Sequence, residues 1–170
     1  MTYFSPSVYT DISAKPVSFS NAPQSTNINL SVNGQIPFAS ITAQIGTAPT
    51  LSSGNIVLPV GYWYYLESAC QVYVPTGSVT KDHWVDIQWH DGSSYVGSIG
   101  RTSGYNLIDN GTIGRDEKAF VLVDATSASV TVSLKIVAYG PSGMGQINYT
   151  SGHYIYAGLG RAIIIGLEAP

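Results

Sequence analysis

The chain has 170 residues and a mass of 18.0 kDa, which suits one globular domain with an appendage. Only 10% of its residues are charged, against about 25% in an ordinary soluble domain, so the surface is predicted to be coated with Ser, Thr, Asn and Gly or to be buried against other copies. A formal net charge of -3 provides no basic patch, and no run approaches the ~18 apolar residues of a membrane span, so neither nucleic acid nor membrane insertion is expected.

The first 36 residues differ in composition from the rest of the chain. They are rich in Ser, Asn, Thr and Pro, and their charged residues are Asp11 and Lys15. Asn33-Gly34 and Pro37 mark a boundary. We therefore predict an extended N-terminal arm over residues 1–36, used for attachment, and one globular domain over residues 37–170.

The globular part is predicted to consist of short strands. β-branched and aromatic residues alternate there with polar ones, and Gly, Pro, Asn and Asp separate the runs. The first two runs are Tyr64 to Val74 and His83 to His90, and Asp91-Gly92 predicts a hairpin turn into Tyr95 to Ile99. The residues expected on the apolar faces of these two runs are Tyr64, Leu66, Cys70, Val72 and Val74, and then Val85, Ile87 and Trp89.

Three later runs continue the pattern. Phe120 to Asp124 and Ser129 to Tyr139 are predicted to be half-buried strands, and Ala162 to Leu167 is apolar on both faces. A strand of that last kind is expected to be covered on both sides, and a subunit interface is the simplest cover. The apolar face of the second of these runs is predicted to comprise Val130, Val132, Leu134, Ile136 and Ala138.

Two segments, NIVLPVGYWYYLESACQVYVP and HWVDIQWHDGSSYVGSIGR, resemble the C1q/TNF-like jelly-roll domains found in phage fibres, head decorations and tail knobs. The additional His90 departs from the family pattern. The resemblance implies an all-β, antiparallel two-sheet jelly-roll sandwich with three copies packed about an axis. The family also tends to carry a V-x-V-x-L-x-I strand and to end on an apolar strand such as RAIIIGLEA. The residues that match the pattern are Ile56, Leu58, Pro59, Gly61, Tyr64, Leu66, Ala69, Gln88, Trp89, Asp91, Tyr95, Gly97, Gly100, Val130, Val132, Leu134 and Ile136.

Catalytic chemistry finds little support in the sequence. Glu67 and Asp86 are candidate glycosidase carboxylates, which would have to face each other across a sugar, but solvated or interface carboxylates are favoured. His83, His90 and His153 lack the spacing of a zinc site. We predict no enzymatic activity and no cofactor.

A calcium site is a less favoured alternative to a protein without a bound metal. Asp91, Asp109 and Asp116 fall in predicted loops, where a hard cation finds carboxylate and carbonyl ligands, but no acidic calcium-loop motif is present. The single cysteine, Cys70, is interpreted as a buried thiol.

Tyrosine is abundant, with 12 Tyr and 3 Trp against 4 Phe. Such side chains suit subunit interfaces and sugar-binding surfaces, and the interface interpretation is favoured. The residues predicted to form an oligomer interface are Ile163, Ile164, Ile165, Leu167, Trp84, Tyr65 and Tyr73. The candidate contacts with a host glycan are Tyr105, Tyr149, Tyr154 and Tyr156.

Together these patterns favour a bacteriophage structural protein located in the virion. It would form a homotrimer as a capsid decoration, fibre or tail-knob component, bind other virion proteins through residues 1–36, and contact a host glycan or membrane protein through loops such as Gly100 to Arg115. A lectin-like carbohydrate-binding module is the second hypothesis, and a polysaccharide-degrading enzyme is the third.

Overall fold

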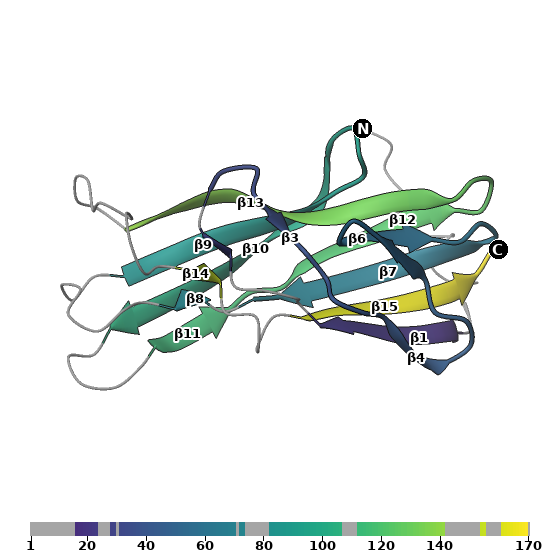
Figure 1. The fold of residues 1–170 in the computed structure, drawn as a ribbon, viewed down its shortest axis with the longest axis horizontal. Helices are drawn as coiled ribbons and strands as arrows, with labels where there is room; N and C mark the ends of the chain where they lie inside the picture. Colours follow the sequence, from purple (N-terminus) through teal and green to yellow (C-terminus); the bar gives the residue numbers. More distant parts are fainter. Residues whose placement is uncertain are drawn as a thin grey trace, which may run out of the picture.

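The computed structural model describes residues 16–23, 28–29, 31–70, 72–73, 82–106, 112–141, 154–155 and 161–169. Two antiparallel sheets lie face to face, and a small third sheet lies at one end of the molecule (Figure 1). In spatial order, the five-stranded sheet contains β12 (Ala119–Ala125), β7 (Tyr62–Ala69), β15 (Arg161–Glu168), β1 (Pro16–Pro23) and β4 (Thr42–Ile45).

The second layer is a seven-stranded sheet. Its strands in spatial order are β11 (Thr112–Asp116), β10 (Tyr95–Asn106), β9 (Asp82–His90), β13 (Val130–Pro141), β6 (Asn55–Leu58) and β5 (Thr50–Ser52), and β3 (Gln35–Ile36) also pairs with β13. The small sheet contains β2 (Ile28–Asn29), β14 (Tyr154–Ile155) and β8 (Val72–Tyr73).

The pairing of the principal strands defines a jelly roll. Eight strands of the two sheets pair as four antiparallel couples, the first with the last in chain order: β1 with β15, β6 with β13, β7 with β12, and β9 with β10. This is the pairing of one long hairpin rolled into two sheets. The predicted fold class, an all-β antiparallel two-sheet jelly-roll sandwich, is confirmed.

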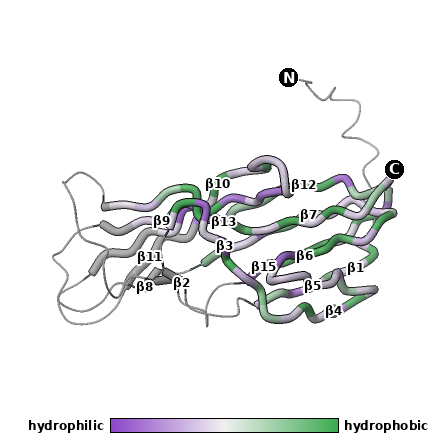
Figure 2. The backbone as a smooth tube through the Cα atoms, turned by 45° about the horizontal axis from the view of Figure 1, so that its top comes forward, coloured by the Kyte–Doolittle hydropathy of each residue, from purple (hydrophilic) through white to green (hydrophobic). Residues whose placement is uncertain are grey.

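Alternating side chains from both sheets fill the core between them. Trp89 of β9 is fully buried and stacks on Phe38 with ring centroids 6.2 Å apart. Its indole N–H donates a hydrogen bond of 3.2 Å to the backbone carbonyl of Ala119, so this side chain ties the seven-stranded sheet to β12 across the core. Figure 2 shows hydrophobic residues, in green, in the strands of both sheets. The other fully buried large side chains are Ile36, Ile56, Leu58, Leu66, Val85, Ile87, Leu134, Ile136 and Ile164.

The N-terminal boundary differs from the prediction of an arm over residues 1–36. Pro16–Pro23 forms β1, which lies between β15 and β4 inside the five-stranded sheet. The inward residues of β1 are Ser18, Ser20 and Ala22, all buried, so the strand has no inward-facing stripe of large apolar residues by which it would be recognised. Any arm is therefore confined to residues 1–15, which lie outside the described part of the chain.

Two further strand predictions are corrected in detail. The run from Tyr64 to Val74 is divided into β7 and β8, and Val74 lies outside the described residues. In β13 a bulge between Ile136 and Ala138 turns Ala138 away from the core face and opposite Asp86. The predicted turn after His90 is confirmed, with Gly92 at a φ of 97° and the Asp91 N–H bonded to the Ser94 carbonyl.

The free edge of β12 is covered by a bulge in β10. The Ser98 hydroxyl accepts a hydrogen bond of 3.0 Å from the Phe120 N–H. Gly97 lies so close that a Cβ there would be 2.2 Å from the Phe120 carbonyl oxygen, and its φ is 73°. Glycine is therefore required at this position. The bulge closes one side of the sandwich.

Candidate functional site: the outer face of the five-stranded sheet

An unbroken apolar row crosses the outer face of the five-stranded sheet. Strand pairing places one outward residue from each strand directly beside the next, in the order Leu122, Tyr65, Ile165, Phe19 and Ile45. Neighbouring strands lie about 4.8 Å apart, so the row spans about 19 Å. A sheet face that meets water normally presents polar side chains at such positions.

The rows on either side are mixed in character. On one side the paired residues are Phe120, Glu67, Ile163, Asn21 and Thr42, and on the other they include Asp124, Trp63 and Leu167. The outward residues of β7 and β15 are partly buried, but Phe120 remains 49% exposed. Apolar side chains therefore continue into both flanking rows, where they alternate with polar ones.

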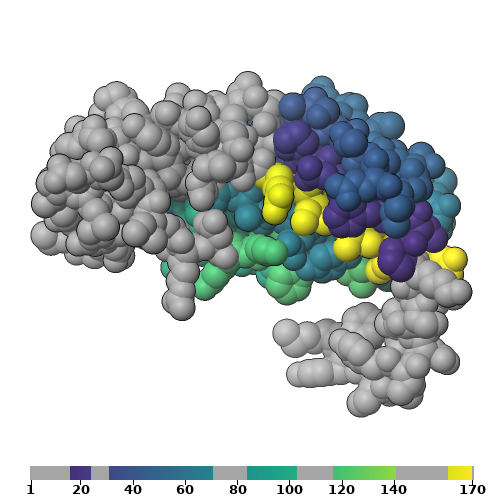
Figure 3. Space-filling view, turned by 90° about the horizontal axis from the view of Figure 1, so that it is seen from below, coloured from purple at the N-terminus to yellow at the C-terminus, as the bar shows by residue number. Residues whose placement is uncertain are grey.

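The central row ends in exposed aliphatic residues on both sides of the sheet. Leu122 is 55% exposed and Ile45 is 52% exposed, although both are large aliphatic side chains. In Figure 3 the yellow atoms of β15 are seen between purple β1 and the teal and green strands β7 and β12. Contiguous apolar surface of this kind indicates a binding face more often than scattered single residues do.

The shape of the face differs between its two ends. At the β1–β4 end, a shallow hollow of about 320 Å³ is lined by Pro16, Phe19, Gln44, Ile45 and Ile165. At the opposite end, the exposed side chains of β12 and of the adjoining β10 bulge are Phe120, Leu122 and Ile99. One end is thus a recess, and the other carries exposed apolar side chains.

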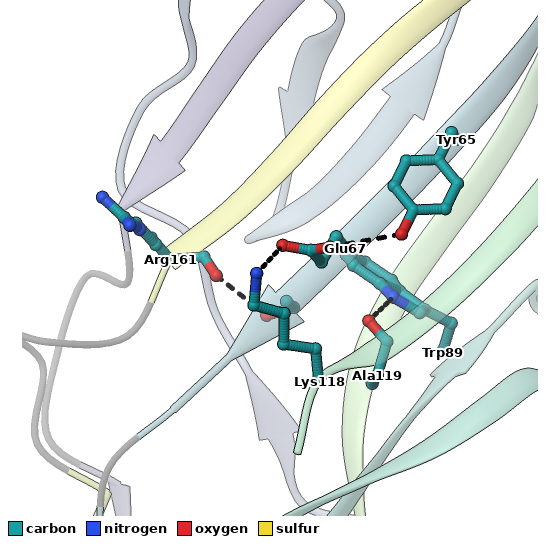
Figure 4. A network of polar contacts seen from close by, with 7 residues as sticks. Tyr65, Glu67, Trp89, Lys118, Ala119 and Arg161 are labelled. Atoms are coloured by element: carbon teal, nitrogen blue, oxygen red, sulfur yellow. Dashed lines mark hydrogen bonds and ion pairs between the residues drawn. The ribbon is translucent and has the colours of Figure 1, made fainter. Parts of the chain in front are cut away.

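A polar network lies on this apolar face (Figure 4). The Glu67 carboxylate accepts a hydrogen bond of 2.5 Å from the Lys118 ammonium through Oε1 and one of 3.2 Å from the Tyr65 hydroxyl through Oε2. The Tyr65 ring also stacks on Phe120, with centroids 6.4 Å apart. Burial, and secondly the Glu67 carboxylate, raise the pKa of Tyr65, so its hydroxyl remains a donor at neutral pH.

The outer face of the seven-stranded sheet has a different character. Arg101 forms two hydrogen bonds, of 2.6 and 2.7 Å, with the buried carboxylate of Asp86, and its guanidinium lies 4.5 Å from the ring centroid of Trp84. Hydrogen bonding to Asp86 raises the pKa of Arg101. Farther along, the Tyr95 hydroxyl donates to Asn33 at 2.5 Å. These polar side chains of the described part of the face therefore have partners within the chain.

The residues predicted to form an interface are distributed over several places. Ile163, Ile165, Leu167 and Tyr65 point outward on the apolar face. Ile164 is fully buried in the core and is not available to a partner. Trp84 lies on the opposite outer face, under Arg101. Alternation along β15 explains the correction at Ile164, because neighbouring residues point to opposite sides of a sheet.

The other predicted contact residues lie at the end of the molecule that contains the small sheet, or outside the described residues. Tyr73 of β8 pairs in register with Tyr154 of β14, so an interface candidate and a glycan candidate are backbone neighbours. Tyr105 pairs with Ile113 in β10 and β11. Tyr149 and Tyr156 are outside the described residues.

The candidate catalytic carboxylates are not brought together. Glu67 faces outward from the five-stranded sheet, whereas Asp86 faces outward from the seven-stranded sheet on the other side of the core. A sugar cannot lie between two groups separated by the whole sandwich. The geometry therefore does not support the glycosidase hypothesis.

The aspartates considered for a calcium site do not form one in the described part of the chain. Asp91 accepts hydrogen bonds from the N–H groups of Ser93 and Ser94, which lower its pKa to about 2 and fix the turn. Asp109 and His153 lie outside the described residues. Within the described ranges, no group of three or more His, Cys, Asp or Glu side chains could hold a metal ion, and no helix is long and apolar enough to cross a membrane.

Sequence reasoning missed several residues of the face. Phe19, Ile45, Leu122 and Lys118 were not among the predicted interface residues, although the structure places them on it or at its edge. The available signal was the run Phe120 to Asp124, in which Phe120 and Leu122 alternate with Val121 and Val123. Like β15, this strand is apolar on both faces, and the same pattern predicts that its outer face is covered.

Comparisons with known proteins provide little beyond this geometry. No family model matches the chain, and no curated protein matches it. A solved structure entitled "Structure of Eiger TNF from S. frugiperda" aligns with a TM-score of 0.48 and 10% sequence identity, over 92% of this chain and 96% of that one. The jelly-roll assignment follows from the strand pairing described above.

Proposed function

We propose that this chain is a non-enzymatic structural protein of a bacteriophage particle, which acts as a homotrimer and attaches to other virion proteins through its N-terminal segment. The observation that carries the proposal is the five-residue apolar row from Leu122 to Ile45. Covering a half-exposed aliphatic or aromatic side chain contributes about 1 kcal/mol. Several such side chains lie together on this face.

A second copy of the chain is the occupant that the shape of the face favours. The recess at β1 and β4 and the exposed side chains Phe120 and Leu122 of β12 lie at opposite ends of one face. A contact between two such unlike ends is heterologous, because each copy uses one end to bind the next. Heterologous contacts produce a closed ring when the rotation between copies closes.

The composition supports the same proposal. With 10% charged residues, the chain has few of the charges that keep a monomer apart from its copies in solution. The number of three copies and the place on a phage particle rest on the resemblance to C1q/TNF-like jelly-roll domains, which begins at Asn55 and continues to the final apolar strand, rather than on the sheet geometry.

The attachment proposal is tested by deleting residues 1–15 and measuring the chain in purified particles by quantitative mass spectrometry. This deletion leaves β1 in place, whereas deletion of residues 1–36 would remove β1 from the five-stranded sheet, β3 from the seven-stranded sheet and β2 from the small sheet. We expect the truncated protein to keep its oligomeric mass and to be absent from particles. Incorporation equal to that of the full chain would contradict the proposed attachment.

A further inference from the structure

The outer face of the five-stranded sheet contains a charged group, Glu67, in one of its central strands, whereas Asp124 lies exposed near the end of the edge strand β12. Among the described outward residues of β7, β15 and β1, Glu67 is the one charged side chain away from the strand ends. It lies in register between Phe120 and Ile163, and its side chain is 21% exposed. Any molecule that covers the apolar row would come close to this carboxylate.

An isolated carboxylate would oppose such a contact. Removing an unpaired charge from water costs several kcal/mol, and an apolar partner provides no hydrogen bond or opposite charge to offset that cost. Glu67 is not isolated, because Oε1 accepts from the Lys118 ammonium and Oε2 from the Tyr65 hydroxyl. Both oxygens have a donor within the same chain, so the covering molecule need not supply one.

The same network orders apolar surface next to the row. The Tyr65 hydroxyl is held by Glu67 while its ring stacks on Phe120. Two aromatic rings from β7 and β12 are therefore held in place before a partner arrives. Side chains that are ordered in advance lose less conformational entropy on binding.

We propose that the Glu67–Lys118 pair determines whether this face accepts a second copy of the chain: it neutralises the carboxylate from within the subunit, so that the face associates with an apolar surface. This inference rests on the proposed self-association and names the residues that permit it. Lys118 has a 56% exposed side chain and stands immediately before β12. Loss of its ammonium leaves a lone charge beside the contact, whereas loss of both charges does not.

The test is a double-mutant cycle on the full chain with Lys118→Met, Glu67→Gln and the double variant. The dissociation constant of the oligomer is measured by analytical ultracentrifugation, and the stability of each subunit by urea unfolding. We expect Lys118→Met to raise the dissociation constant at least tenfold, and the double variant to return to within a few fold of the original protein. Arg101→Met is the matched control, because it also removes the positive partner of a carboxylate, Asp86, but on the opposite outer face.

Self-association of the chain and the role of the Glu67–Lys118 pair can fail separately. If the unsubstituted protein is a monomer, the proposed self-association fails. If it is an oligomer and Lys118→Met associates equally well, or if the double variant is as weak as Lys118→Met, the role of the pair is overturned. Should Lys118→Met not fold, Glu67→Gln provides the comparison, since it is expected to associate more weakly than the double variant.

Discussion

The two outer faces of this sandwich are built from the same alternating strands but carry opposite chemistry. On the five-stranded sheet, the outward positions of a whole row are apolar, from Leu122 to Ile45. On the seven-stranded sheet, outward positions carry groups such as Asp86 with Arg101, and Tyr95 with Asn33. The second face suits water, whereas the first is the surface that we propose is covered by another copy of the chain.

The largest expected effect is a change in assembly caused by one charge on the apolar face. Leu122→Asp places a carboxylate at an exposed end of the row. In the isolated subunit the new carboxylate is exposed to water and should not destabilise the fold. Its burial in a contact between copies costs several kcal/mol. We expect at least a hundredfold weaker self-association, measured by analytical ultracentrifugation.

The equivalent change on the other face serves as the control. Thr131 is exposed on β13 and opposite Val57 of β6, so Thr131→Asp introduces the same charge on the seven-stranded sheet. Self-association is expected to be unchanged. If both variants weaken association equally, the effect is one of net charge and the contrast between the faces disappears.

A second comparison uses adjacent residues of β15 that point to opposite sides. Ile164→Ala removes a fully buried side chain and is expected to lower the free energy of unfolding by about 2–5 kcal/mol. Ile163→Ala, on the outer face, should lower it by less than half as much and should weaken self-association. Urea unfolding at a concentration where the protein is dissociated measures the free energy of unfolding. Equal losses of this free energy in both variants would contradict the assignment of Ile164 to the core and Ile163 to the outer face.

The polar face supplies a smaller effect that should leave assembly intact. Arg101→Met leaves the Asp86 carboxylate, with a 9% exposed side chain, without its ionic partner. Because the Arg101 side chain is itself 50% exposed, solvent screens part of the interaction, and the expected loss is about 1–2 kcal/mol in unfolding free energy. A change in oligomeric mass would show that this face also belongs to a contact.

The smallest expected effect concerns the turn after β9. Hydrogen bonds from Ser94 and Ser93 lower the pKa of Asp91 from 3.8 to about 2. A lowered pKa in the folded state contributes stability that is complete above pH 3.8 and is lost as the pH falls towards 2. Asp91→Asn keeps an oxygen acceptor but does not titrate, so its melting temperature should fall less between pH 4 and pH 2 than that of the original protein. If the melting temperature falls equally in both proteins, a group other than Asp91 causes the loss of stability at low pH.

The sequence predicts much of the core because inward residues there are large and apolar. Val85, Ile87 and Trp89 face the core as their alternation indicates. The pattern fails for β1, in which serines point inward and Phe19 points outward. It also fails after Ile136, because a bulge changes which face the following residues occupy.

The candidate site is predicted only in part. The run of isoleucines in β15 indicates a strand apolar on both sides, but the sequence does not say which residue faces which side, and Ile164 was therefore assigned to the interface. Phe19 and Ile45 join the row only through strand pairings between distant segments. Such pairings depend on the topology of the sheet, which no local pattern contains.

The most direct test of the proposed covered face is the mass of the intact protein in solution, measured by size-exclusion chromatography with light scattering at micromolar concentration. Three copies of the 18.0 kDa chain would have a mass of about 54 kDa, and Leu122→Asp should reduce that mass to the value of one chain. A soluble, folded 18.0 kDa species from the unsubstituted protein would show that the row from Leu122 to Ile45 is stable in water, and would contradict the proposal.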